Sequence, residues 1–185
     1  LLNMGWQHEN VVQFLEKEWQ PEDTAYDVQH RLLSECGKLY QGHFGDDTTV
    51  AALRICVPNP CCVMVGPPVH PEDDEEVVGE LLACPGMKVI CGGTTSQIVN
   101  KRLGKELKIM LQYISPDVPP IATMEGIDLV TEGVVTIGKV LDILEEYAAT
   151  RDPAVLTGAK DGAYLLAEVL AEKCTSVKFI VGRAL

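Results

Sequence analysis

The sequence predicts an α/β fold, in which a mostly parallel, three-layer sheet domain follows a smaller segment of helices and one strand. Short apolar runs at 61–65 and 87–91 have the length and the Val and Ile content of buried strands. Helical periodicity separates such runs, and strands that alternate with helices are joined by crossovers and run parallel. Prolines and a change in composition mark Val57-Pro-Asn-Pro60, so we expect two domains, residues 1–56 and residues 57–185.

The composition excludes two classes of partner. The chain has 185 residues, of which 46% are hydrophobic, and a formal charge of −12. So acidic a chain repels the phosphates of nucleic acids and of anionic membrane surfaces, and we expect neither as a partner. No apolar run is long enough to span a bilayer, and no basic segment leads into a cleavable apolar stretch, so we expect a cytoplasmic protein.

Seven cysteines are present, an odd number without C-x-x-C spacing, which indicates neither a disulfide framework nor a zinc site. We expect them to act as small hydrophobic residues in a reducing compartment. Cys91 stands out, because it ends a strand beside a helix N-terminus, where the pKa of a thiol can be lowered. Burial is the favoured interpretation, since no histidine lies near Cys91 in the sequence.

The first part of the chain is predicted to form two helices and a strand. Apolar residues from Val11 to Trp19 recur at helical spacing, and a second helix follows Pro21. Both helices are expected to bury an apolar stripe, with Trp6 and Trp19 in the core. The apolar run 50–56 then predicts a strand.

Two adjacent acids, Asp46 and Asp47, precede this strand in the turn Gly45-Asp-Asp-Thr-Thr49. Mg²⁺ and Mn²⁺ prefer carboxylate oxygens and accept water for the rest of their coordination shell, so the pair is a candidate metal site. The alternative is that the aspartates only form the turn, where Asp is common.

The segment from Leu1 to Cys56, two helices and then Gly45-Asp-Asp-Thr-Thr-Val-Ala-Ala-Leu-Arg54, resembles the end of the catalytic domain of the stage II sporulation protein E family. Members of this family are metal-dependent (PPM-type) serine/threonine phosphatases with an α/β/β/α sandwich. The resemblance implies that Asp46 ligates a catalytic Mg²⁺ or Mn²⁺, with Asp47 in a secondary role. It also implies that the metal activates water for attack on a phosphoprotein substrate.

The same resemblance implies that the family's other metal-binding aspartates lie upstream, in Asp-Gly motifs. One or two carboxylates cannot hold a two-metal centre, so we expect this chain alone to be inactive as a phosphatase, to supply no catalytic residue and to hold no metal tightly. From Val57 onward, the patterns strand-G-P-P, C-G-G-T-T and E-G-I-D-L-V-T-E-G resemble the region after the phosphatase domain in some clostridial-type members, and this part of the resemblance implies no activity.

The second domain is predicted to alternate strands and helices. The helix after Pro71 starts with five acids, which the helix dipole favours and which repel phosphate. Three prolines make 115–121 a loop. The expected strands are 61–65, 87–91, 107–113, 127–130 and 177–181. The expected helices are 72–84, 94–103, one that begins at 134, and 153–173. The helix that begins at 134 is expected to face inward with Val134, Ile137, Leu141 and Leu144.

The most informative stretch is Gly92-Gly93-Thr94-Thr95, which connects a strand to a helix. A buried strand that turns directly into a helix points free N–H groups outward at the positive end of the helix dipole, which suits a phosphate or a carboxylate. The alternative is a capping box, in which Thr94 and Gln97 satisfy these donors and no ligand is needed.

Three further residues are candidates for the same ligand. Asp128 and Glu132 flank a short strand closed by a glycine, and acids at a strand's carboxyl end can bind a sugar hydroxyl or a metal. The alternative is that Thr131 and Glu132 only cap the next helix. Arg183, just beyond the last strand, is a candidate to reach an anion held at this edge of the sheet.

These residues leave three functions open: part of a serine/threonine phosphatase, a regulatory module that senses a phosphorylated metabolite or nucleotide, and a structural domain that docks a partner or forms a homodimer. Loops 66–70, 92–95, 131–133 and 182–183 are expected to meet at the carboxyl edge of the sheet, where open α/β sheets bind ligands. A dinucleotide dehydrogenase is a poor fit, because G-x-G-x-x-G is absent.

Overall fold

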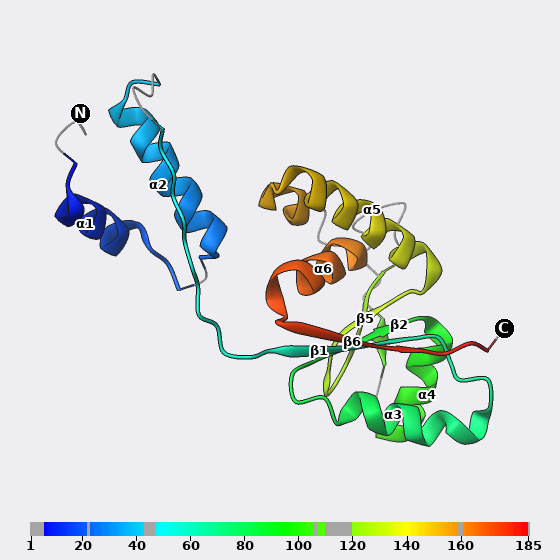
Figure 1. The fold of residues 1–185 in the computed structure, drawn as a ribbon. Helices are drawn as coiled ribbons and strands as arrows, with labels where there is room; N and C mark the ends of the chain where they lie inside the picture. Colours follow the sequence, from blue (N-terminus) through cyan, green and yellow to red (C-terminus); the bar gives the residue numbers. More distant parts are fainter. Residues whose placement is uncertain are drawn as a thin grey trace. The chain divides into compact units, whose positions relative to one another are not determined.

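The computed structural model describes residues 6–21, 23–42, 47–105, 107–109, 120–158 and 161–184. Its contacts divide the chain into two compact units, Leu1–Val57 and Pro58–Leu185. The division falls inside the linker where the sequence places its domain boundary. Figure 1 traces the chain from its blue N-terminus to its red C-terminus.

The first unit contains helices α1 (His8–Glu18) and α2 (Ala25–Leu39). A capping box starts α2: Thr24 Oγ1 accepts a hydrogen bond from the Asp27 N–H at 3.1 Å, and the Asp27 carboxylate accepts one from the Thr24 N–H at 2.8 Å. The two expected helices are therefore formed, and the start of the second has a local cause in the sequence.

Asp23 joins the two helices to the segment that follows them. Its carboxylate accepts hydrogen bonds from both terminal nitrogens of Arg31, and its carbonyl accepts one from Arg54 Nη1 at 2.6 Å. Arg31 also donates to the carbonyl of Glu18, the last residue of α1, at 2.6 Å. The hydrogen bonds from Arg31 hold the pKa of Asp23 below its usual value.

The expected burial of the two helices is wrong. No residue of α1 or α2 is fully buried, and the Trp19 side chain is 55% exposed. Trp6 is half-buried and packs edge-on against Phe14, with ring centroids 5.4 Å apart. The periodicity located the helices correctly, but an apolar stripe is buried only where another layer covers it.

The strand expected at 50–56 is also not formed, since residues 47–59 have no regular secondary structure. Leu53 and Ile55 are 91% and 92% exposed. A strand needs a neighbouring strand for its N–H and C=O groups, and none of the described residues pairs with this segment.

The second unit is built on a six-stranded sheet, as far as the described residues show, in the order β3-β4-β5-β2-β1-β6. The four strands β5, β2, β1 and β6 run parallel, while β4 is antiparallel to β5 and β3 to β4. The strands are β1 (Pro60–Val65), β2 (Met87–Cys91), β3 (Lys108–Ile109), β4 (Ala122–Met124), β5 (Ile127–Thr131) and β6 (Ser176–Val181).

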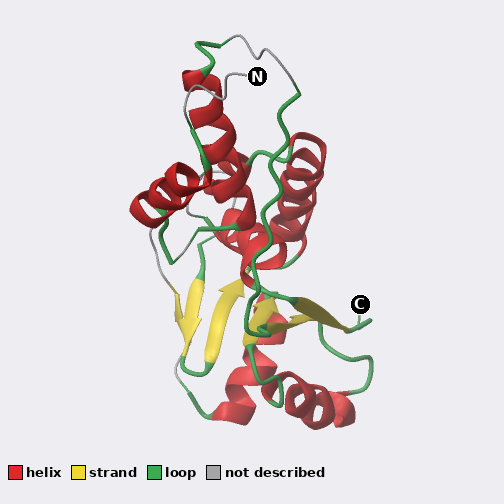
Figure 2. Ribbon diagram, turned by 60° about the vertical axis from the view of Figure 1, so that its left-hand side comes forward, coloured by secondary structure: helices red, strands yellow, loops and turns green. Residues whose placement is uncertain are grey.

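Helices cover both faces of this sheet (Figures 1 and 2). On one face, α3 (Asp74–Leu82) and α4 (Gly93–Leu103) pack on the even-numbered side chains of β1, such as Met64. On the other face, α5 (Val134–Thr150) and α6 (Gly162–Glu168) pack on its odd-numbered side chains, such as Val63. The predicted α/β fold with a mostly parallel sheet is confirmed.

Three details of the second unit differ from the prediction. The helix expected at 153–173 is instead a 3-10 helix (Pro153–Thr157), then α6, then a π-helical turn (Val169–Lys173). A second N-cap interrupts it, because Asp161 Oδ1 accepts hydrogen bonds from the N–H groups of Ala163 and Tyr164. Strand β4 was not expected, and the predicted strand 107–113 is described only at β3, with 110–119 outside the described residues.

The inward stripe of helix α5 matches the expected one only in part. Ile137 and Leu144 pack against the core as expected, whereas Val134 and Leu141 are exposed. The fully buried residues of the helix are Thr136, Val140 and Ile143. Apolar residues occur on most of the circumference of this helix, so periodicity alone does not choose its inner face. Within the described residues, no helix has the length and apolar content needed to cross a membrane.

Candidate functional site

The carboxyl edge of the sheet has a topological switch point between β2 and β5. These two strands are adjacent and parallel, but β2 leads into α4 on one face and β5 leads into α5 on the other. The two connections therefore leave toward opposite faces at this point, which is the position at which open α/β sheets place their ligands.

The chain turns sharply at Gly92 to enter α4. The Gly92 N–H donates to the carbonyl of Thr131 on β5 at 2.9 Å, and the Gly92 carbonyl accepts the first helical bond, from the Ser96 N–H, at 2.9 Å. Gly92 has a φ of +119°, a conformation that side chains rarely adopt, and a Cβ there would lie 3.1 Å from Thr95 Oγ1. Glycine is therefore required at this position for the strand to turn directly into the helix.

The N-terminus of α4 has no side-chain cap among the described residues. The helix begins at Gly93 with Gly92 as its N-cap, so the alternative capping box of Thr94 and Gln97 is not formed. The N–H groups of Gly93, Thr94 and Thr95 precede the first intrahelical bond, and Gly93 and Thr94 are exposed. Two of the residues expected from the sequence are thus at the surface, whereas Thr95 is buried and its side chain is not presented there.

A second helix N-terminus lies beside the first. Helix α5 has Gly133 as its N-cap, again without a side-chain cap in the described chain, so Thr131 and Glu132 do not cap it. A Cβ built on Gly133 would lie 3.5 Å from the Cα of Gly92, which places the two N-caps in contact. The positive ends of two helix dipoles therefore meet at one point of the sheet edge.

Thr136, in the first turn of α5, carries an unsatisfied hydroxyl. The residue is fully buried, and its Oγ1 has no hydrogen-bond partner among the residues that the structure describes. It begins the inward stripe of α5, and side chains of a helix lean toward its N-terminus, which here is Gly133 at the Gly92 turn. A buried hydroxyl without a partner costs about 1–3 kcal/mol, so a ligand or water that reaches it gains a strong contact.

The other predicted ligand residues are distributed along the sheet. Glu132 is exposed beside the Gly92 turn, whereas Asp128 lies at the amino end of β5, where its carboxylate accepts a hydrogen bond from the Lys88 N–H at 2.8 Å. Arg183 follows β6, two strands away from β2. The structure therefore brings Glu132 to the site and removes Asp128 from it.

The metal prediction falls mostly outside the described residues. Asp46 belongs to the undescribed range 43–46, and Asp47 is exposed in a segment without regular secondary structure. In the ranges that the structure describes, no group of three or more His, Cys, Asp or Glu side chains is placed to hold a metal ion.

Cys91, at the end of β2, is buried as expected. Burial raises the pKa of its thiol, and a hydrogen bond with Thr131 offsets only part of that effect. The nearby helix N-terminus therefore does not make Cys91 a nucleophile, and the thiol acts as a small apolar group of the core.

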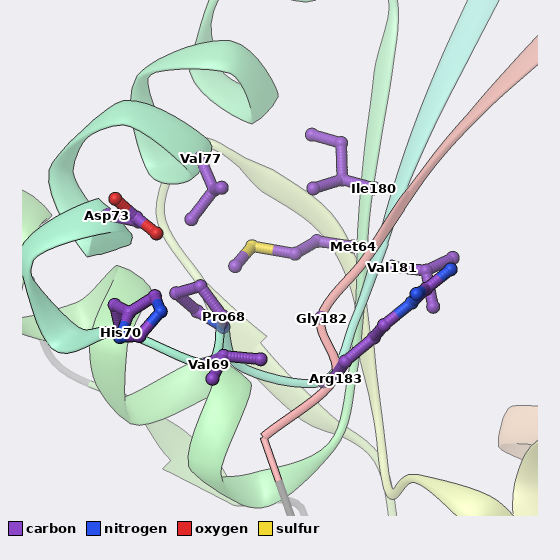
Figure 3. A pocket seen from close by; sticks show the side chains of 11 residues that line it. Met64, Pro68, Val69, His70, Asp73, Val77, Ile180, Val181, Gly182 and Arg183 are labelled. Carbon is purple, nitrogen blue, oxygen red and sulfur yellow. The ribbon is translucent and has the colours of Figure 1, made fainter.

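A cavity of about 360 Å³ opens at the same sheet edge between β1 and β6. Met64, Val77 and Ile180 form its apolar part, and His70 and Asp73 stand on the side of α3 (Figure 3). The Arg183 side chain extends away from these two residues in the same view. The sequence placed loops 66–70 and 182–183 at this edge but did not predict a cavity there, because the pairing of β6 with β1 is not visible locally.

No protein-family model, curated protein or solved structure matches this chain. The candidate site consists of two uncapped helix N-termini, one buried hydroxyl and an apolar cavity, all along the carboxyl edge of one parallel sheet.

Proposed function

We propose that residues 58–185 form a regulatory domain that binds a small anionic ligand at the Gly92 turn. The observation that carries this proposal is the contact between the two uncapped N-caps, Gly92 and Gly133. The first N–H groups of α4 and α5 have no partner within their own helices, and an oxyanion such as phosphate accepts several such bonds at once.

The energetics favour an anion over a neutral ligand. An anion at a single helix N-terminus gains about 0.3–1 kcal/mol at an exposed position and up to about 2 kcal/mol when partly buried. Hydrogen bonds to a charged acceptor contribute about 1.5–3 kcal/mol each. A phosphate that spans both N-termini combines these contributions without a cationic side chain. The exposed carboxylate of Glu132 opposes them, so we expect affinity in the micromolar to millimolar range, suited to sensing a metabolite.

Inorganic phosphate and the variant Gly93→Asp test the proposal in the full chain. A Cβ on Gly93 meets no atom within 4 Å, so the variant keeps its fold while placing a carboxylate over the helix N-terminus. Phosphate should raise the unfolding temperature of the native chain and not that of Gly93→Asp. Gly79→Asp, at another exposed position with open space on α3, is the control and should keep the shift. An equal shift in Gly93→Asp would place phosphate elsewhere.

A second candidate function concerns residues 1–57, which we propose belong to a phosphatase domain of the stage II sporulation protein E type. The motif Gly45-Asp-Asp-Thr-Thr49 supports this, together with the uncovered alternation of Leu53, Ile55 and Val57. Such alternation is typical of a strand that joins a larger sheet. In that case the ligand-binding domain regulates dephosphorylation of a phosphoserine or phosphothreonine protein.

The phosphatase proposal predicts a division of activity between two polypeptides. A polypeptide in which this chain follows the family's Asp-Gly motifs should release phosphate from a phosphoserine protein with Mn²⁺, and Asp46→Asn should abolish that release. Residues 1–185 alone should not release phosphate, because two adjacent carboxylates cannot hold a two-metal centre. Equal activity of the two polypeptides would contradict the proposed ligand set.

A further inference from the structure

The cavity between β1 and β6 lies on the same edge and the same face of the sheet as the N-terminus of α4. Its apolar residues Met64, Val77 and Ile180 belong to the core that α3 and α4 cover. Only β1 separates β2, which carries the Gly92 turn, from β6. Neighbouring strands are about 4.8 Å apart, so the cavity begins roughly 5–10 Å from the proposed anion site.

The cavity has the chemistry to hold an uncharged, flat group. Met64 and Ile180 are almost fully buried at its base, and the Met64 thioether points toward Val77 (Figure 3). A thioether is polarisable and packs well against the edge or face of a ring. The volume of about 360 Å³ lies at the lower end of the range for small-molecule sites.

The rim of the cavity carries charges of both signs. Asp73 and Arg183 both line it, together with His70. Acidic residues also fill the first turn of α3, which begins beside the cavity, and they repel phosphate, whereas the first turn of α4 has no acid. The N-termini at the Gly92 turn therefore suit the charge of a ligand better than the cavity does, and the apolar base of the cavity suits its uncharged body.

We propose that the ligand of this domain is bipartite: a phosphomonoester whose phosphate sits at the two helix N-termini and whose flat, uncharged ring system fills the cavity between β1 and β6. This inference rests on the proposed function and names the ligand class for that site. It uses two independent features. One is the hydroxyl of Thr136 in the first turn of α5, which has no partner among the described residues, and the other is the apolar cavity between β1 and β6. A mononucleotide has this form, with a phosphate and a planar base at opposite ends.

The experiment compares four probes by titration calorimetry with the full chain: inorganic phosphate, ribose 5-phosphate, adenosine 5′-monophosphate and adenosine. Burial of the planar base should make adenosine monophosphate bind at least about tenfold more tightly than ribose 5-phosphate. Adenosine, which lacks the phosphate, should bind more weakly than the monophosphate by a similar factor. These comparisons use the native protein and do not depend on the folding of any variant.

A cavity-filling variant adds a second readout. Val77→Phe fills the apolar part of the cavity from α3 and should reduce the affinity for adenosine monophosphate to that for ribose 5-phosphate, without changing the affinity for inorganic phosphate. Val177→Phe is the matched control, because Val177 points to the opposite face of the sheet at the amino end of β6 and is already exposed. The control should bind all four probes as the native chain does.

The outcomes separate this inference from the proposed function. Equal affinities for adenosine monophosphate and ribose 5-phosphate would overturn the bipartite ligand, while phosphate binding that Gly93→Asp abolishes would leave the proposed function intact. Adenosine binding as tightly as its monophosphate would also overturn the bipartite ligand. Absence of binding by every phosphate-bearing probe would remove both proposals.

Discussion

Gly133 lies against Gly92, with 3.5 Å between the position of a Cβ on Gly133 and the Cα of Gly92. This contact brings together two helix N-termini that are forty-one residues apart in the sequence, Gly92 before α4 and Gly133 before α5. Neither helix has a side-chain cap in the described chain, and α3 also lacks one, whereas α2 and α6 are capped. Two uncapped helices thus meet at the switch point.

Gly133→Ser should weaken the binding of phosphate with little change in stability. The new hydroxyl can accept a hydrogen bond from the first turn of α5, which gains a few tenths of a kcal/mol over glycine. The ψ of −103° at Gly133 lies outside the regions that residues with a side chain prefer, so the backbone has to shift for serine, and this cost offsets the gain. Thermal unfolding without ligand and phosphate titration measure the two effects, and unchanged affinity would show that the α5 donors do not contact the anion.

Thr136→Val should stabilise the protein in the absence of ligand and weaken its binding of phosphate. Valine has the shape of threonine and a similar helix propensity, so the change removes only the unsatisfied buried hydroxyl. We expect the free energy of unfolding without ligand to rise by about 1 kcal/mol and the affinity for phosphate to fall. Chemical denaturation and calorimetry check both. Loss of stability instead would mean that an ordered water satisfies this hydroxyl in the free protein.

Gly182→Ala should destabilise the second unit because the β1 and β6 ends pass very close to each other. A Cβ on Gly182 would lie 2.0 Å from the carbonyl oxygen of Pro67, a backbone atom that cannot rotate away. Such overpacking costs about 1–3 kcal/mol. Gly79→Ala is the control: its Cβ meets open space in α3 and should stabilise by about 0.5–1 kcal/mol. Equal unfolding temperatures for the two variants would contradict the close approach of Gly182 to the Pro67 carbonyl.

Stability should fall at alkaline pH through Cys61. Burial raises the pKa of the Cys61 thiol from 9.0 to about 12. Between these pH values the Cys61 thiol ionises in the unfolded chain but stays protonated in the folded chain. Its contribution to the free energy of unfolding is therefore complete below about pH 9 and is lost as pH rises toward 12. Denaturation at pH 8 to 11 measures this, with Cys61→Ala as the comparison.

At pH 8, exposed Cys56 should react first with a thiol reagent and buried Cys61 last.

Stability of the first unit should fall on acidification through Asp23. The hydrogen bonds from Arg31 hold the pKa of Asp23 below its usual value, so the folded chain releases this proton more readily than the unfolded chain. The stabilisation is present above about pH 4 and is lost as pH falls through the lowered pKa. Arg31→Lys should shift the acid transition to higher pH. The single ammonium group of lysine cannot replace the two terminal nitrogens with which Arg31 donates to both carboxylate oxygens of Asp23. Circular dichroism between pH 2 and 6 checks the shift.

The local part of the site could be predicted from the sequence. The expected strand 87–91 and β2 (Met87–Cys91) have the same bounds, and α4 begins at Gly93, within one residue of its prediction. A strand that ends in two glycines determines its own turn, because only glycine adopts the φ of Gly92 without strain. Thr94 and Gln97 also matched a capping box, and only the structure decided against that alternative, since the helix begins two residues too early for it.

The long-range part of the site could not be predicted. Nothing near Thr136 indicates that it faces the sheet, because the apolar residues around it occupy most of the circumference of α5. Asp128 was expected beside Glu132, yet it lies at the opposite end of β5, since a five-residue strand separates its two ends by about 17 Å. The first unit shows the same limit, as its helices formed where expected but its apolar residues remained uncovered.

The sequence by itself determined the local elements of this protein: its strands, its helices, the glycine turn at Gly92 and the acidic start of α3, all of which depend on residues within a few positions of one another. The tertiary structure alone decided that β5 lies beside β2 and β6 beside β1. Those neighbours follow from the burial of both sheet faces at once, a property of the whole chain. That order places Gly133 on Gly92, leaves Thr136 without a partner and opens the cavity above Met64.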